Sequence, residues 1–312
     1  MGGYVATIGM FDGVHQGHQF VLQHVVQQAQ ERGLQSLCIT FDHSPRQEQV
    51  LTPLDEKLRL IRQTGIGHIE VLAFTPELKS LTARQFMEQV LKEHLHVCVL
   101  LTGYDNRFGY NRKEGFDDYV RYGHELGIEV IALPPLPQHP SNTQHPSPIT
   151  QVSSSVIRQL LTEGQVEEAA ACMGHSYTIT GHVTHGEHVG TGMGYPTANL
   201  VADDPSQLIP ASGVYAVYVF PNTQRPSPDT QPSPNTQCPL PYKGMMNIGT
   251  RPTFGKHPQT LEVHLLHYHG DLYDQQLSVS FVSRLREERR FENAETLKEQ
   301  IKQDAIKAEQ VL

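Results

Sequence analysis

The stretch that decides the fold runs from Val5 to His18 and reads VATIGMFDGVHQGH. Its first part, Val5 to Ile8, is a short apolar and β-prone run, which predicts a buried strand. Gly9 and Gly13 follow at once and indicate a turn directly after this strand.

A helix is predicted after the turn, from Gly17 to a C-terminal stop at Gly33. Its apolar face consists of Phe20, Val21, Leu22, Val25, Val26 and Ala29. His15 and His18 therefore lie where a strand feeds a helix N-terminus, a place where backbone N–H groups and the helix dipole favour phosphate. Imidazoles there can offset charge that builds on a leaving pyrophosphate. For either histidine alone, a solvated turn residue is the alternative.

The string GMFDGVHQGH resembles the signature of HIGH-type nucleotidyltransferases, and its FDGVH form resembles bacterial bifunctional riboflavin kinase/FAD synthetases. The resemblance implies an α/β + β architecture. A Rossmann-like nucleotidyltransferase domain, with a parallel sheet and helices on both faces, would precede a small six-stranded type of β-barrel with a C-terminal helix. It also implies that ATP is bound by Gly9, Phe11, Asp12, Gly13, His15 and His18, and that both histidines are catalytic.

Length and composition agree with two domains and a soluble protein of 312 residues. The net charge of −9 argues against general affinity for nucleic acid, but not against a small nucleotide. No apolar run approaches the ~18 residues of a membrane span, and the chain enters a strand within a few residues, so we expect a cytoplasmic protein. The four cysteines are far apart and predict reduced thiols, not a zinc or disulfide framework.

Strand-like and helical patterns alternate in the first half of the chain. Strands are predicted at 36–41, 69–74, 97–101 and 128–133, with helices at 55–64, 82–95 and 113–126. This alternation indicates βαβ units and a parallel sheet. Ligands of such sheets bind beyond the carboxyl ends of the strands.

Polar clusters follow two of these strands, at 42–45 and 102–109. The resemblance implies that flavin is bound there, by Asp42, Asp105, Arg107 and Phe108. Asn106 departs from the aromatic residue usual in the family, and His43-Ser44 departs from its usual Pro-His. As an alternative, Asp42 and Asp105 cap the following turns or helices.

The segment VSSSVIR at 152–158 has the pattern of a helix N-cap that also suits phosphate, because hydroxyls, free N–H groups and a guanidinium converge. It resembles the second phosphate motif of the nucleotidyltransferases. The resemblance implies ATP binding by Ser153, Ser154, Ser155 and Arg158, with Arg158 also catalytic.

Two insertions, near 137–151 and 221–241, are rich in Pro, Ser, Thr, Asn and Gln and share the phrase NTQxPSP. Such composition cannot bury apolar surface, so we interpret both as surface loops. A PxxP ligand role is the alternative.

A second domain is predicted after a helix at 156–174. Short strands at 177–185, 213–220, 242–248, 261–269 and 277–283 indicate a small barrel. A final helix at 293–312 is expected to cover it with one face, made of Ala294, Leu297, Ile301, Ala305 and Ala308. The expected boundaries are 1–174 for an FMN adenylyltransferase domain and 175–312 for a riboflavin kinase domain.

The string GTGMGYPTAN, ending at Asn199, combines a glycine loop that can approach phosphates with a hydroxyl and an amide that can hold Mg²⁺. It resembles the riboflavin kinase signature. The resemblance implies ATP binding by Gly186, Gly192, Gly194, Pro196, Thr197 and Asn199, with Thr197 and Asn199 also holding the metal. A β-turn with polar caps is the alternative.

Glu262 alternates with apolar neighbours in a predicted strand and points to the opposite face, where it could take a proton from a primary alcohol. A solvated strand glutamate is the alternative. The resemblance implies that Glu262 is the catalytic base and that flavin is bound by Asn247, Arg251, Glu262 and Arg286.

The expected function is therefore a two-step transferase: riboflavin is phosphorylated by ATP to FMN, and FMN is adenylylated by a second ATP to FAD and pyrophosphate. Riboflavin, FMN and ATP are the expected partners, with Mg²⁺ as cofactor and neither nucleic acid nor membrane. Two alternatives stay open, a nucleotidyltransferase for another phosphorylated acceptor and a non-catalytic flavin-binding protein.

Overall fold

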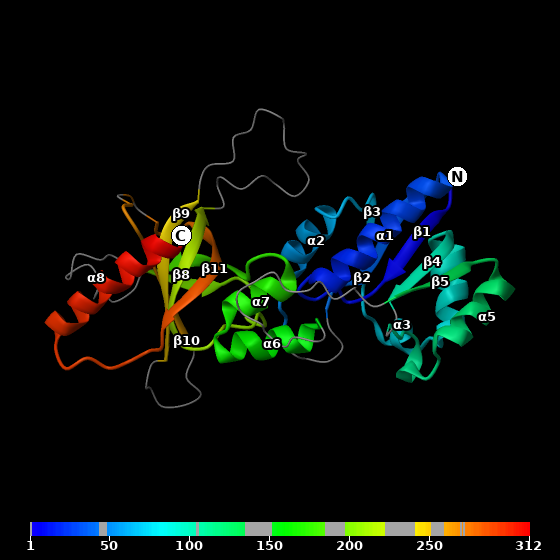
Figure 1. Cartoon of the computed structure of the whole chain (residues 1–312). Helices are drawn as coiled ribbons and strands as arrows, with labels where there is room; N and C mark the ends of the chain where they lie inside the picture. Colours follow the sequence, from blue (N-terminus) through cyan, green and yellow to red (C-terminus); the bar gives the residue numbers. More distant parts are fainter. Residues whose placement is uncertain are drawn as a thin grey trace. The chain divides into compact units, whose positions relative to one another are not determined.

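The computed structural model describes residues 2–43, 49–103, 106–134, 152–184, 197–221, 241–250, 259–268, 270 and 272–312. The chain divides into two compact units, an N-terminal unit of Met1–Ser153 and a C-terminal unit of Ser154–Leu312. Each unit has its own strands and helices (Figure 1) and is considered by itself.

The N-terminal unit is built on a five-stranded sheet in the order β3-β2-β1-β4-β5. Its strands are β1 (Tyr4–Ile8), β2 (Gln35–Phe41), β3 (His68–Leu72), β4 (Val97–Gly103) and β5 (Glu129–Leu133). Every pair is parallel, which confirms the prediction. The chain adds β2 and β3 on one side of β1, then β4 and β5 on the other. The strand order thus reverses beside β1, where open α/β sheets place their ligands.

Helices cover both faces of this sheet. One face packs against α1 (Gln16–Arg32) and α2 (Leu54–Arg62), and the other against η1 (Phe86–His94) and α5 (Phe116–Leu126). Shorter helical segments are α3 (Pro76–Ser80), α4 (Ala83–Gln85) and η2 (Tyr110–Arg112). Leu22, Val25 and Ala29 of the predicted α1 face are buried, and the helix ends at Gly33 in the left-handed conformation (φ 64°), as expected.

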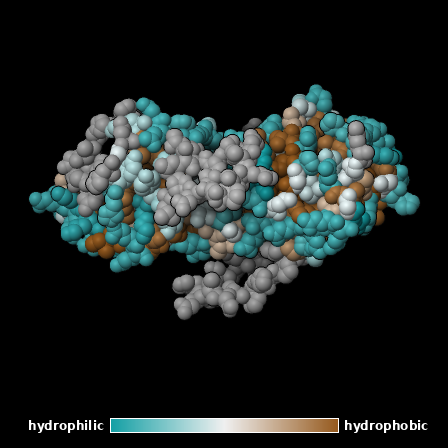
Figure 2. Space-filling view, turned by 90° about the horizontal axis from the view of Figure 1, so that it is seen from above, coloured by the Kyte–Doolittle hydropathy of each residue, from teal (hydrophilic) through white to brown (hydrophobic). Residues whose placement is uncertain are grey.

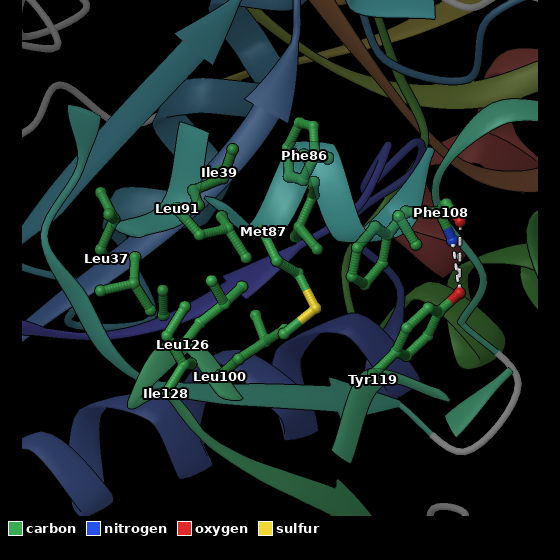
Figure 3. Packing of buried hydrophobic residues seen from close by; sticks show 14 residues of the cluster. Leu37, Ile39, Phe86, Met87, Leu91, Leu100, Phe108, Tyr119, Leu126 and Ile128 are labelled. Atoms are coloured by element: carbon green, nitrogen blue, oxygen red, sulfur yellow. Dashed lines mark hydrogen bonds between the residues drawn. The ribbon is translucent and has the colours of Figure 1, made fainter. Parts of the chain in front are cut away.

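The hydrophobic core between the sheet and the helices η1 and α5 holds the segment that follows β4 (Figure 3). The Tyr119 ring stacks on Phe108 with 4.2 Å between ring centroids, and its hydroxyl accepts a hydrogen bond from the Phe108 N–H at 3.0 Å. The same hydroxyl lies 3.1 Å from the Glu114 carbonyl oxygen. The chain between β4 and α5 is therefore held from within the core.

The predicted helix at 82–95 is only partly α-helical. Thr82 and Gln85 form a capping box at the start of α4, and the continuation η1 is a π-helix of nine residues. Such widened turns keep the apolar face, so the 3.6-residue pattern of the sequence does not distinguish them.

The C-terminal unit begins with two helices, α6 (Ser154–Glu163) and α7 (Val166–Met173), where one helix was predicted. The break lies at Gly164, which adopts φ 79°. A side chain there would meet the Arg284 guanidinium, because an added Cβ atom lies 2.8 Å from its Cζ. The predicted end at Gly174 is confirmed by its left-handed conformation (φ 76°).

Six antiparallel strands then close a barrel in the order β10-β7-β6-β11-β8-β9. They are β6 (Thr178–Thr184), β7 (Ala198–Ala202), β8 (Gly213–Pro221), β9 (Tyr242–Thr250), β10 (Gln259–Leu265) and β11 (Gln276–Arg286). The strands predicted from the sequence did not include β7. The first residues of β7 belong to the PTAN string, which the sequence analysis assigns to a phosphate-binding loop.

Helix α8 (Ala294–Val311) packs across β8, β9 and β11 (Figure 1). Of its predicted inner face, Ala308 is buried, and Ile301 and Ala305 are half-buried against Ala216, Met245 and Leu266. Ala294 is exposed and does not belong to this cluster, so the prediction was wrong there. Hydrophilic residues and hydrophobic patches both reach the face viewed in Figure 2. No helix in the described ranges has the length and apolar character to cross a membrane.

Candidate functional site

The loop between β1 and α1 has a strained backbone. Phe11 (φ 50°) and Val14 (φ 36°) both adopt positive φ, and both side chains are buried. Positive φ is costly for a non-glycine residue and most of all for a β-branched one. Gly13 between them (φ 83°) has no space for a side chain, because an added Cβ would lie 2.9 Å from Leu51 Cδ1. Such strain persists only where the surroundings fix the backbone.

The start of α2 supplies one set of contacts that fixes this loop. The Asp12 carboxylate accepts hydrogen bonds from the N–H groups of Leu51 (2.9 Å) and Thr52 (3.1 Å). In return the Thr52 hydroxyl accepts from the Gly13 N–H at 3.0 Å, in a buried position. Asp12, expected to bind ATP, therefore holds the shape of the loop.

Three further side chains bind loop carbonyl groups, each from a different element. Asn106 donates to the Ile8 oxygen (2.6 Å), the Thr40 hydroxyl to the Met10 oxygen (3.3 Å) and the Gln19 amide to the Val14 oxygen (2.8 Å). Asn106, the residue that departs from the family pattern, thus joins the end of β4 to the end of β1.

The two histidines are in contact at the start of α1. His15 is the N-cap residue, and its Nδ1 accepts from the His18 N–H at 3.4 Å. The two rings stack with 3.6 Å between centroids and 18° between planes. His15 is buried, and among the described residues the buried Nδ1 of His18 has no hydrogen-bond partner. An unpaired buried nitrogen at a helix N-terminus suits a ligand oxygen.

The charge state of His18 follows from its surroundings. Burial lowers the pKa of His18 well below its usual value, and the neighbouring His15 and Lys57 lower it further. His18 is therefore neutral near pH 7. Its ring then carries one N–H donor and one acceptor nitrogen.

Lys57 is a buried cation that the sequence analysis missed. Its ammonium donates to the Phe41 carbonyl oxygen at the end of β2 (2.8 Å). Burial lowers the pKa of Lys57, while the negative charges of Asp12 and Asp42 oppose this shift. Lys57 occupies the apolar face of α2 beside Leu60 and Ile61, which is the signal that could have revealed it.

The expected flavin residues of the N-terminal unit have different surroundings. Asp42 accepts from the N–H groups of His43 (2.8 Å) and Phe74 (3.0 Å), so its carboxylate joins the end of β2 to the segment that follows β3. Burial alone would raise the pKa of Asp42, but these hydrogen bonds and the His43 ring lower it below its usual value. Phe108 lies in the core, Arg107 is exposed, and Asp105 falls outside the described residues.

Ser153 precedes α6, which begins at Ser154 and contains Ser155 and Arg158. The division between the two compact units falls between Ser153 and Ser154. The helix start predicted from the VSSSVIR string is thus present at the beginning of the C-terminal unit.

Strand register in the barrel brings the predicted kinase residues side by side. Glu262 of β10 pairs with Asn199 of β7 on one side and with Asn247 of β9 on the other. Asn247 pairs in turn with Val214 of β8, and Val214 with Arg286 of β11. Directly paired residues share one face of a sheet. We call Asn199, Glu262, Asn247 and Arg286 the polar row.

Thr197 and Asn199 flank the buried Ala198, and both are half-buried. Their hydroxyl and amide oxygens, next to the Glu262 carboxylate, are the donor types that Mg²⁺ prefers. Among the described residues no group of three or more His, Cys, Asp or Glu side chains could hold a metal ion. Mg²⁺ usually takes one or two protein oxygens together with substrate phosphates, so this donor set fits it. Gly186, Gly192, Gly194, Pro196 and Arg251 lie outside the described residues.

Comparison with known proteins covers both units. The FAD synthetase family model matches residues 1–146, and the riboflavin kinase family model matches residues 173–312. Proteins named bifunctional riboflavin kinase/FMN adenylyltransferase are similar over nearly the whole chain. The Escherichia coli K12 protein is 33% identical, covering 98% of this chain and 92% of its own. The Pseudomonas fluorescens protein is 35% identical with the same coverage.

A solved structure supports the fold. A Streptococcus pneumoniae protein described as a macrolide-efflux protein superposes with a TM-score of 0.82 and 27% identity, covering 97% of this chain and 93% of that one. Its name describes that protein, and the likeness adds to the argument for the architecture of this chain.

Proposed function

The chain belongs to the bifunctional riboflavin kinase/FMN adenylyltransferase family, and from this premise we propose which residues carry each of its two reactions. It is a transferase that uses ATP with riboflavin and FMN, and FAD is its product. We assign adenylyl transfer to residues 1–174 and the kinase reaction to residues 175–312. The two family-model matches support this division.

Adenylyl transfer depends on the strained loop and the histidine pair. The FMN phosphate oxygen attacks the α-phosphorus of ATP, and the bond to the leaving pyrophosphate breaks. No protein nucleophile is needed, so positioning and charge stabilisation supply the catalysis. His15 and His18 bind phosphate oxygens at the N-terminus of α1, beside the loop that contains Gly9, Phe11, Asp12 and Gly13. The unpaired buried Nδ1 of His18 is the observation that carries this proposal.

The remaining contacts of this reaction rest on sequence resemblance. Ser153, Ser154, Ser155 and Arg158 would bind ATP phosphates, and Arg158 would stabilise charge in the transition state. The flavin of FMN would be bound by Asp42, Asp105, Arg107 and Phe108. Of the three described residues, Asp42 and Arg107 are exposed and Phe108 lies in the core.

Riboflavin phosphorylation uses the polar row. Glu262 accepts the proton of the ribityl 5′-hydroxyl as that oxygen attacks the γ-phosphorus of ATP, and ADP leaves. Thr197 and Asn199 would hold Mg²⁺, which when bound neutralises charge on the ATP phosphates. Asn247, Arg251 and Arg286 would bind the flavin, while Gly186, Gly192, Gly194 and Pro196 would approach the phosphates of ATP. The pairing of Glu262 between Asn199 and Asn247 supports this assignment.

One incubation tests the function of the whole chain. The protein is mixed with riboflavin and Mg-ATP, and flavins are separated by HPLC over time. FMN should appear first and FAD should follow, with neither formed when ATP is omitted. Bound but unchanged riboflavin would identify a flavin-binding protein. Conversion of riboflavin to FMN alone would point to another acceptor for the N-terminal unit.

A further inference from the structure

Asp304 is a buried carboxylate on α8 with a defined set of partners. Its side chain is 2% exposed. Its Oδ2 accepts from Nε of Arg286 at 2.8 Å, and its Oδ1 accepts from the Gln300 amide at 2.6 Å. Both oxygens are therefore bound, and the charge is paired within the C-terminal unit.

A buried ion pair stabilises the packing of a helix less effectively than its short distance suggests. Burying a carboxylate costs free energy that pairing only partly offsets, and a well-packed apolar residue often stabilises as well. In α8 the only buried residues are Asp304 and Ala308. The helix therefore places a charge where an apolar side chain would suffice for packing.

Arg286 is oriented by three neighbours. Besides its bond to Asp304, its Nη1 donates to the Glu287 carbonyl oxygen at 3.0 Å. Its guanidinium lies 5.5 Å from the centre of the Phe291 ring. A guanidinium has five N–H donors, so donors beyond these two bonds remain for a substrate oxygen.

The polar row lies on the barrel face that α8 covers. Ala216, Met245 and Leu266 contact α8. Ala216 and Met245 are each two residues from a row position, at Val214 and Asn247, so both share that face. Asp304 extends from α8 toward the same face and forms an ion pair with Arg286, which lies at one end of the polar row. The helix thus contacts the side of the barrel that carries the proposed base Glu262.

We propose that Asp304 is a positioning residue for riboflavin phosphorylation, acting through Arg286, whose guanidinium it holds in place at the end of the polar row. This inference rests on the proposed function, in which Arg286 binds the flavin.

The test compares three variants of the full chain and measures FMN formation at varied riboflavin. Asp304→Asn keeps the shape but removes the charge that orients Arg286. We expect kcat/KM for riboflavin to fall about tenfold, mainly through KM, as a small misplacement of a binding group can produce. Arg286→Gln should produce a fall of at least the same size. The double variant should be no worse than Arg286→Gln alone, because the two residues act as one unit.

Glu309→Gln is the matched control. It makes the same carboxylate-to-amide change on the same helix and removes the negative charge that faces His267 at 2.5 Å, without touching Arg286. It should leave kcat/KM within about twofold, as expected for an exposed pair. An equal loss in Glu309→Gln would overturn the proposal, because Asp304 would then only attach α8. Additive losses in the double variant would overturn it too.

Failure of the underlying assignment looks different. If Arg286→Gln phosphorylates riboflavin normally, the flavin role of Arg286 is wrong and the inference falls with it. If Arg286→Gln is impaired and Asp304→Asn is normal, only the inference is wrong. Should Asp304→Asn not fold, Gln300→Leu replaces it, since it releases Oδ1 but keeps the ion pair. A rise in KM of about fivefold would support the proposal, and a KM that stays within about twofold would contradict it.

Discussion

The two units present their candidate catalytic residues by opposite means. In the N-terminal unit, the histidine pair follows an irregular loop with two buried residues at positive φ. Side chains from α1, from β2, from the segment before α2 and from the segment after β4 hold this loop. In the C-terminal unit, the polar row comes from regular strand pairing. A site of the first kind depends on its supporting contacts, and a site of the second kind on the closure of the barrel.

The strongest test of this contrast is Glu262→Gln. Loss of the proposed base should reduce FMN formation about 10³-fold, within the range for general-base catalysis. FAD formation from supplied FMN should be unchanged, and HPLC assays with each substrate measure both. Loss of both activities in a folded protein would break the assignment of one reaction to each unit.

The reciprocal change is His18→Ala. We expect FAD formation to fall about 10²-fold, the size typical of removing one charge-stabilising donor. FMN should still accumulate from riboflavin at the normal rate. An unchanged FAD rate would show that the buried Nδ1 serves packing and no ligand.

Thr52→Val tests whether the loop needs its supports. The buried Gly13 N–H loses its acceptor, which should cost about 1–3 kcal/mol of unfolding free energy in the N-terminal unit. FAD formation should fall with it, while FMN formation stays normal. Thr64→Val is the control, since its hydroxyl binds the Ile61 oxygen within the end of α2, away from the loop.

The pH dependence of stability should also differ between the units. The pKa of His18 is lowered on folding, so below about pH 6.5 the unfolded chain binds a proton that the folded chain does not. The N-terminal unit should lose stability as pH falls from there towards the folded pKa of His18. Thermal unfolding of the protein and of His18→Asn between pH 5 and 8 measures this. The variant should be less sensitive to acid, and equal slopes would contradict the burial argument.

The smallest effect is expected from deleting residues 224–238. Val219 pairs with Tyr242, so β8 and β9 can be joined by a shorter connection. Both activities should stay within about twofold, because shortening a polar loop changes closure entropy little. A large loss of kinase rate would show that the segment does more than connect strands.

The spacing of apolar residues was enough to predict the helices and strands whose pattern lies within their own sequence. The parallel strands, α1 with its Gly33 end and the C-terminal helix all follow from apolar spacing. Apolar spacing did not predict β7, which is defined by its pairing with β6. It also did not distinguish the π-helix η1 from an α-helix.

The same distinction applies to the candidate sites. His15, His18, Glu262 and Asn199 belong to short motifs, so the sequence alone indicated them. Thr52 lies 39 residues from the glycine that it supports, and no local pattern links the two. For Asp304 and Lys57, the one signal in the sequence is a charged residue on an otherwise apolar helix face.

The arrangement of the strands has one more consequence, for behaviour during heating. The described barrel is a closed ring, so its strands offer no unpaired backbone groups to another molecule. The five-stranded sheet ends in the edge strands β3 and β5, which carry charged residues such as Glu70 and Glu129. When the protein is stressed, self-association should therefore begin at these two edges, and extra lysines there should delay turbidity.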